Sequence, residues 1–277
     1  MTARPQFADR SVPSAGRNAG PALRRVGALS RAELNLFRRN RTAVFSALGM
    51  PLVLVGAVSG VDVGRRTLST TAFLVTSMLG FVLLTAVYYN LVTAYVARRE
   101  DLVLKRLRVG ELHDAEILAG VASPSVVVSL VQVAVVVVVG TMIGLPVPVN
   151  PLLLALGITG GIVMFVLLAA VSTAFTRTPE TAQITTLPVL LACMLGSGLM
   201  VPLDVLPGAV VDVLRILPMT PVLELVRLGW LGTTGSGPEQ GFLGVLGPAL
   251  APSAILTVWL VLGVISVRRW FRWDPRR

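Results

Sequence analysis

The sequence predicts an all-α, polytopic membrane protein with six transmembrane helices, an N-terminal interfacial amphipathic helix and a re-entrant external helix pair before the last span. Hydrophobic residues make up 54% of the 277 residues, and the mean hydropathy is +0.80. Six apolar runs contain no Asp, Glu, Lys, Arg or His, and each is long enough to cross about 30 Å of hydrocarbon. The runs cover residues 42–61, 67–97, 117–145, 151–175, 182–201 and 248–267.

The basic residues lie mostly on one side of the membrane that these runs define. When the loops are assigned to alternate sides, 20 of the 24 Lys and Arg residues fall on the side of both termini. The positive-inside rule therefore places both termini in the cytoplasm. We read the net charge of +10 as a topology signal and a contact with anionic lipid headgroups, not as nucleic-acid binding.

The N-terminal region precedes the first span in two parts. Residues 1–21 are rich in Pro, Ser, Gly and Arg, and we expect a disordered cytoplasmic tail. Residues 22–40 place Arg side chains on one helical face and apolar side chains on the other, which predicts a helix in the cytoplasmic interface. The membrane domain then extends to residue 267, and residues 268–277 form a basic cytoplasmic tail.

The second apolar run is longer than the bilayer requires, so we expect its helix to continue into the cytoplasm. A densely charged segment, residues 98–116, follows it. The fourth run returns to the fifth through a short charged turn at residues 176–180. The segment 202–232 is interrupted by Pro and acidic residues, and it predicts two short external helices joined at Pro218. We expect them to dip into the outer interface, which is tolerated where the backbone is buried against protein.

The sequence lacks the residues of several known chemistries. A phosphate-binding P-loop needs a Gly-Lys pair, but the single lysine, Lys105, follows Leu104. The single histidine, His113, offers no pair for a zinc site, and the single cysteine, Cys193, can form no disulfide within the chain. The spans carry no ionisable residue of the kind that proton-coupled transport usually needs. We therefore expect no catalytic or metal site in this chain.

The cytoplasmic segment that begins at Arg98 mixes both charge signs with regularly spaced leucines. Such a segment suits docking into a groove of a soluble partner, with leucine anchors and a charged rim. The alternative is a charged connector that only covers the ends of the helices.

In order and topology, these features resemble the permease subunits of ABC exporters of the type-2 fold, in the bacterial drug-exporter branch. The resemblance covers residues 22–270. The coupling pattern of that family, R-x-E/D-x-L-x-L-K-R-L-R-x-x-P/G-L, is similar to Arg99 through Leu112. The family's external helix pair is matched by Ser197, Gly198, Pro202, Leu206, Pro207, Pro218, Pro221, Leu225, Arg227 and Trp230.

The resemblance implies that two permeases, identical or different, pair and sit on two copies of a separate ABC ATPase. ATP and Mg²⁺ would bind to that partner, so this chain would need no cofactor and would not be an enzyme. Glu100 and Asp101 would be charged partners at the contact, and Leu104 and Leu107 buried anchors. The full set of coupling residues is Arg99, Glu100, Asp101, Leu104, Lys105, Leu107, Arg108 and Gly110, with a second, smaller contact at Arg177 and Glu180.

The resemblance also implies an export path between the two permeases in a bacterial inner membrane. Candidate lining residues lie in the second span: Thr85, Tyr89, Asn90 and Thr93. Packing between helices is the alternative role for these side chains. The uncharged bundle fits a hydrophobic drug or a lipid-like substrate. Two other functions stay open from the residues alone, an ATP-independent carrier or lipid scramblase and a non-transporting membrane scaffold.

Overall fold

The computed structural model describes residues 68–104, 113–200, 206–235 and 237–271, together with the single residues 27, 31 and 203. In these ranges every regular element is helical and no strand occurs, which confirms the all-α prediction. The predicted first span, 42–61, and all of the predicted interfacial helix except Gly27 and Arg31 lie outside the described residues. The elements are α3 (Thr70–Val82), the π-helix η1 (Leu83–Tyr89), α4 (Asn90–Glu100), α6 (Asp114–Met142), α7 (Pro151–Ser172), α8 (Pro179–Gly196), α9 (Gly208–Leu214), α10 (Met219–Leu231) and α11 (Leu246–Trp270).

Among the described residues, four helices are long and apolar enough to cross a membrane: Thr70–Glu100, Asp114–Met142, Pro151–Ser172 and Leu246–Trp270. The first combines α3, η1 and α4 in one continuous helix, as the long second run predicts. α8 is helical where the fifth span is predicted, but it is not among the four, because its first turns are polar and include Glu180 and Gln183. The chain is thus a polytopic membrane protein, while the count of six spans stays a prediction.

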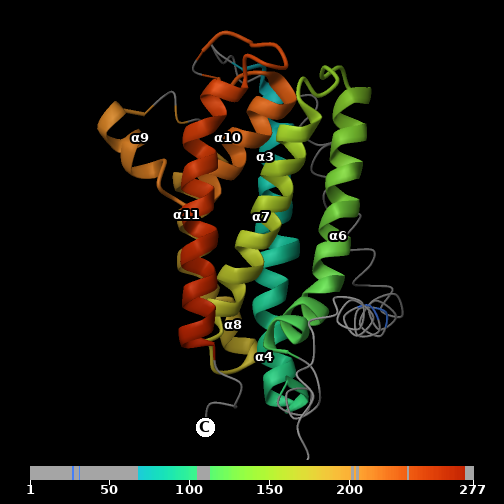
Figure 1. The fold of residues 1–277 in the computed structure, drawn as a ribbon, viewed down its shortest axis with the longest axis vertical. Helices are drawn as coiled ribbons and strands as arrows, with labels where there is room; N and C mark the ends of the chain where they lie inside the picture. Colours follow the sequence, from blue (N-terminus) through green and yellow to red (C-terminus); the bar gives the residue numbers. More distant parts are fainter. Residues whose placement is uncertain are drawn as a thin grey trace, which may run out of the picture.

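The ends of the helices alternate between the two ends of the bundle (Figure 1). The end of α4, the turn from α7 to α8 and the end of α11 lie at the lower end in this view. The turn from α6 to α7 and the loop from α10 to α11 lie at the upper end. Within the described residues, the segments that the sequence assigns to one side of the membrane therefore lie together.

The predicted pair of short helices is present as α9 and α10, and α10 is far more buried than the interfacial position that the sequence predicts. Every residue of α10 except Glu224 is buried, and the helix packs against α7, α11 and α3. Gly229 lies directly against the backbone of Leu154, where a Cβ atom would collide. The indole Nε1 of Trp230 donates to the Pro146 carbonyl at 2.9 Å. The α10 helix thus belongs to the core of the upper end.

The start of α7 is fixed by Asn150. Its side-chain oxygen accepts a hydrogen bond from the Leu153 amide at 3.0 Å, which makes it the N-cap. Its side-chain amide donates to the Phe242 carbonyl at 3.0 Å, and its backbone amide donates to the Gly229 carbonyl at 2.8 Å. One residue therefore joins α7, the end of α10 and the loop that precedes α11.

The second span widens in its middle, because residues 83–89 form a π-helix. Segments of this kind are rare and often occur at functional sites. Tyr88 in η1 shares a hydrogen bond of 3.0 Å with the Ser172 hydroxyl, and its ring lies 6.1 Å from the ring of Phe165. The π-helix is thus held against α7 on one side.

Candidate functional site

At the lower end of the bundle, a buried arginine in the last turn of α4 connects this helix to a neighbouring turn. Arg99 is 1% exposed. Its Nη1 donates to the Thr173 carbonyl at 2.9 Å, and its Nη2 donates to the Thr176 and Arg177 carbonyls at 2.7 and 3.2 Å. The last carbonyls of a helix have no partner within the helix, and the planar guanidinium offers several donors in a fixed geometry. Arg99 therefore fastens α4 to the turn between α7 and α8.

Threonine hydroxyl groups stabilise the turn between α7 and α8 to which Arg99 donates. Thr176 Oγ1 donates to the Ser172 carbonyl at 2.9 Å and shares a hydrogen bond of 2.8 Å with the Thr185 hydroxyl. Thr178 is the N-cap of α8. A hydrogen bond from the Thr178 side chain holds the pKa of the exposed Glu180 carboxyl below its ordinary value. A carboxylate at this position also suits the positive end of the helix dipole.

The predicted coupling residues divide into exposed and buried groups. Glu100 and Asp101 are exposed at the end of α4, and Leu102 beside them is 39% exposed with a φ of 59°. Leu104 is 0% exposed and belongs to the core of its own chain, so in this conformation it offers no anchor to a partner. The remaining members of the set, Lys105, Leu107, Arg108 and Gly110, lie outside the described residues.

The structure brings the two predicted cytoplasmic contacts together. The carbonyl of Arg177 accepts from Arg99, while the Arg177 side chain is exposed, as is Glu180. Phe175 in the same turn is 67% exposed. We define the lower surface as the exposed residues of both segments: Glu100, Asp101, Leu102, Phe175, Arg177 and Glu180. It presents apolar side chains between charged ones, a composition that is common at protein interfaces.

The buried position of Arg99 was not predicted from the sequence. A signal was present, because Arg99 follows Tyr95 by four residues and Val92 by seven, and all three lie on the buried face of one helix. The Tyr95 hydroxyl donates to the Leu118 carbonyl at 2.9 Å, so the same face also binds α6. Arg99 is therefore buried because it lies on the packed face of α4, although it is charged.

The four predicted path residues lie in η1 and α4 on the side that the described helices leave partly open. Asn90 is exposed, and Thr85, Tyr89 and Thr93 are half-buried. The Thr85 hydroxyl donates to the Phe81 carbonyl at 2.8 Å, and the Thr93 hydroxyl donates to the Tyr89 carbonyl at 3.3 Å. The two threonines thus satisfy their hydroxyls within their own helix. Of these four residues, only Asn90 is exposed.

A second buried arginine organises the upper half of the bundle. Arg227 of α10 is 5% exposed. Its Nη2 donates to the Gly198 carbonyl at 2.8 Å and to the Ser77 hydroxyl at 3.3 Å, and its Nε donates to the Thr76 hydroxyl at 3.3 Å. Its guanidinium carbon lies 5.0 Å from the centre of the Phe73 ring. We refer to these contacts as the upper clamp, since they join α10, α3 and the segment that follows α8.

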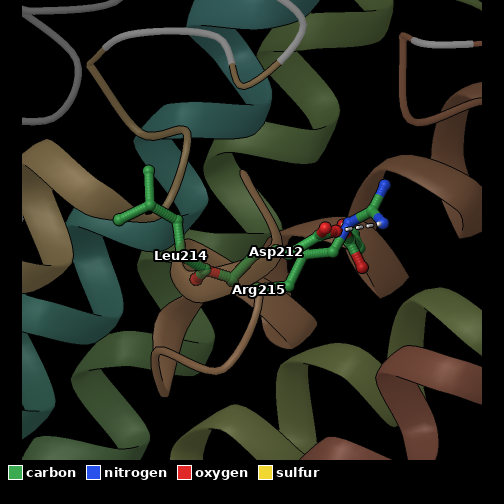
Figure 2. A network of polar contacts seen from close by, with 5 residues as sticks. Asp212, Leu214 and Arg215 are labelled. Carbon is green, nitrogen blue, oxygen red and sulfur yellow. Dashed lines mark hydrogen bonds and ion pairs between the residues drawn. The ribbon is translucent and has the colours of Figure 1, made fainter. Parts of the chain in front are cut away.

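A polar network connects α9 and α10 (Figure 2). Arg215 lies 3.6 Å from Asp212 and 3.9 Å from Glu224, and the Thr220 hydroxyl donates to the Leu214 carbonyl at 2.7 Å. Burial raises the pKa of Glu224, and the nearby Arg215 acts in the opposite direction. Exposed ion pairs contribute little to stability, so the network orients α9 more than it stabilises the fold.

The described residues contain no group of three or more His, Cys, Asp or Glu side chains that could hold a metal ion. Cys193 is buried in α8. His113 is exposed before α6, with its Nδ1 3.6 Å from a carboxylate oxygen of Glu116. Buried arginines thus organise two polar sites of the described residues, one at Arg99 and one at the upper clamp.

Comparison with known proteins gives one family. The family described as ABC-2 type transporter matches residues 24–230 of this chain, which is more than half of its length. The matched range contains the lower surface, the polar residues of the second span and the upper clamp. No curated protein sequence matches the chain.

Proposed function

We propose, from the premise that the chain belongs to the ABC-2 type transporter family, that it forms an export path for a hydrophobic drug or lipid-like substrate and that a separate ATPase drives it. As a member of this family the chain is a membrane-spanning permease component of an ABC transporter. The lower surface is the observation that supports this proposal most. It is a mixed apolar and charged patch at the end of α4, where the family's coupling segment begins.

The proposed ATPase contact consists of the exposed residues of the lower surface. Glu100, Asp101, Arg177 and Glu180 supply charge, while Leu102 and Phe175 supply apolar side chains. An aromatic side chain surrounded by polar residues is typical of the residues that dominate binding energy. This assignment replaces Leu104 with Leu102 and Phe175, since Leu104 is buried in its own chain. ATP and Mg²⁺ would bind to the partner, in two copies for each pair of permeases.

The proposed substrate path faces a second permease. Thr85, Tyr89, Asn90 and Thr93 place polar groups on the open side of the second span. The neighbouring α8 also leaves one apolar face exposed, at Ile184, Leu187, Leu191 and Leu195. A second copy, or a related permease, would cover both faces and enclose a mainly apolar path with a few polar groups, as ligand sites usually have. We place this assembly in a bacterial inner membrane with both termini in the cytoplasm.

The proposal is tested by separating ATP-driven export from autonomous lipid movement. Purified chain alone is reconstituted into vesicles that contain a fluorescent NBD-labelled phosphatidylcholine, and dithionite bleaches the label of the outer leaflet. We expect about half of the fluorescence to survive, as in protein-free vesicles, because this chain has no energy source and no partner there. Bleaching of nearly all the label by the chain alone would identify a scramblase and contradict the proposal.

A further inference from the structure

We propose that Arg99 is a positioning residue that makes the end of α4 and the turn before α8 move as one unit. The binding of the ATPase at Glu100 and Asp101 would then be transmitted to α8 through the Arg99 guanidinium. This inference rests on the proposed function and adds to it the route by which the signal enters the membrane domain.

The geometry at Arg99 connects two segments that are far apart in the sequence. Its three acceptor carbonyls, at Thr173, Thr176 and Arg177, lie more than 70 residues further along the chain. Because the side chain is almost fully buried, water cannot easily replace these bonds. A displacement of the α4 end must therefore either carry the turn along or break hydrogen bonds to a charged group.

The contact continues from the turn into α8. Thr176 accepts from Arg99 through its carbonyl and shares a hydrogen bond with Thr185, which lies in the second turn of α8. The Arg177 carbonyl, the third acceptor, lies two residues before the first residue of α8. Through these contacts, Arg99 binds the turn and, by way of the turn, the start of α8.

Between its two ends, α8 contacts the second span through α4 and η1 and buries Ala182, Thr186 and Cys193. Much of its surface is exposed. At its far end, the carbonyl of Gly198 accepts from Arg227, which also binds Thr76 and Ser77 of α3. Two buried arginines therefore connect the segments that flank α8 to the second span, Arg99 through the turn before α8 and Arg227 through Gly198 after it.

The next residue after Arg99 along α4 is Glu100, an exposed member of the lower surface. A partner that moves Glu100 therefore moves the adjacent guanidinium. Because interfaces and packed cores switch between discrete arrangements, we expect the turn and α8 to shift together with the end of α4.

The test measures hydrogen exchange in the purified complex of the permease with its ATPase, before and after the addition of ATP and vanadate. Four chains are compared: wild type, Arg99→Gln, Arg99→Lys and Arg269→Gln. Arg269 is an exposed arginine in the last turn of α11 at the same end, so its substitution controls for the loss of one positive charge. Maleimide labelling of the buried Cys193 shows whether each variant is folded.

In wild type and Arg269→Gln, amide exchange should change both in residues 100–104 and in residues 173–181. The change should be at least about tenfold, the factor that corresponds to one hydrogen bond to a charged group. In Arg99→Gln the exchange rate in residues 100–104 should still change, while that in residues 173–181 should change by less than about twofold. Arg99→Lys should fall between the two, because an ammonium group cannot reproduce the fork of donors.

Several results would overturn the inference. A full response of residues 173–181 in Arg99→Gln would show that the signal takes another route. If Arg99→Gln is unfolded, Arg99→Lys provides the test. A response of residues 173–181 in Arg99→Lys that equals the wild-type response would also show that the signal takes another route. If the wild-type chain carries no ATPase, the proposed function itself fails and the transmission fails with it. Normal ATPase binding in all four chains with equal responses overturns the transmission alone.

Discussion

Replacement of Arg227 by lysine tests the upper clamp, because lysine keeps the charge but loses the planar fork. In the structure the donors Nε and Nη2 reach Thr76, Ser77 and Gly198 at 2.8 to 3.3 Å. A single ammonium group in this site keeps at best the shortest of these contacts. Loss of the two bonds to hydroxyl groups costs about 1 kcal/mol each, and a weaker contact with the Phe73 ring adds about 0.5 kcal/mol. The free-energy cost of burying a charge remains, since the lysine ammonium is at least as strongly hydrated as the arginine guanidinium.

We therefore expect Arg227→Lys to lower the free energy of unfolding by about 2–3 kcal/mol. This corresponds to a fall in Tm of about 5–10 °C for a chain of this size. The measurement is thermal unfolding of detergent-purified protein with a thiol-reactive fluorogenic maleimide. Cys193, the single cysteine of the chain, is 0% exposed and so becomes reactive when the bundle opens.

Arg215→Lys is the matched control for this substitution. Arg215 belongs to the same external helix pair, but its ion pairs with Asp212 and Glu224 are long, and its side chain is half exposed. We expect a change of less than about 0.5 kcal/mol for the control. If Arg227→Lys unfolds within about 1 °C of the wild type, or no lower than Arg215→Lys, the guanidinium geometry carries no stability and our reasoning about the clamp is refuted.

Two further predictions concern packing and topology. Gly229→Ala places a methyl group against the backbone of Leu154, and we expect a loss of about 1–3 kcal/mol in the same unfolding assay; a wild-type Tm would contradict the close packing. In intact cells an impermeant maleimide should label Val147→Cys, at the upper end, but not Arg269→Cys, at the lower end, against the low background of the buried Cys193. The reverse labelling pattern would invert the predicted orientation.

The helical architecture was predictable because it follows from local patterns. Long uncharged runs require helices in a membrane, and Pro218 at the junction of two apolar stretches correctly predicts the division into α9 and α10. The π-helix in the second span was not predicted, since nothing in the composition of residues 83–89 distinguishes it from an α-helix.

The roles of the charged residues were harder to predict, because they depend on partners that are distant in the sequence. Arg99 and Arg227 are both buried, and their acceptors lie in segments distant in the sequence, the turn before α8 and Gly198 after α8. The family resemblance implies that Leu104 is an anchor buried in the ATPase, yet Leu104 belongs to the core of its own chain. Proximity of Arg99 to the turn at Arg177 follows only from the packing of α4 against α7 and α8.

The central claim is that this permease is driven by a separate ATPase that binds the lower surface. The most direct measurement is the amount of P-loop ATPase that co-purifies per copy of the tagged chain from native membranes, for wild type and for the double variant Glu100→Arg and Asp101→Arg. Both positions are exposed, so the variant should fold normally. We expect one ATPase per wild-type permease and a loss of at least about tenfold in the variant, because two charges at an interface are reversed. Recovery of wild-type permease without any nucleotide-binding partner would contradict the account, and full ATPase recovery with the double variant would contradict the docking surface.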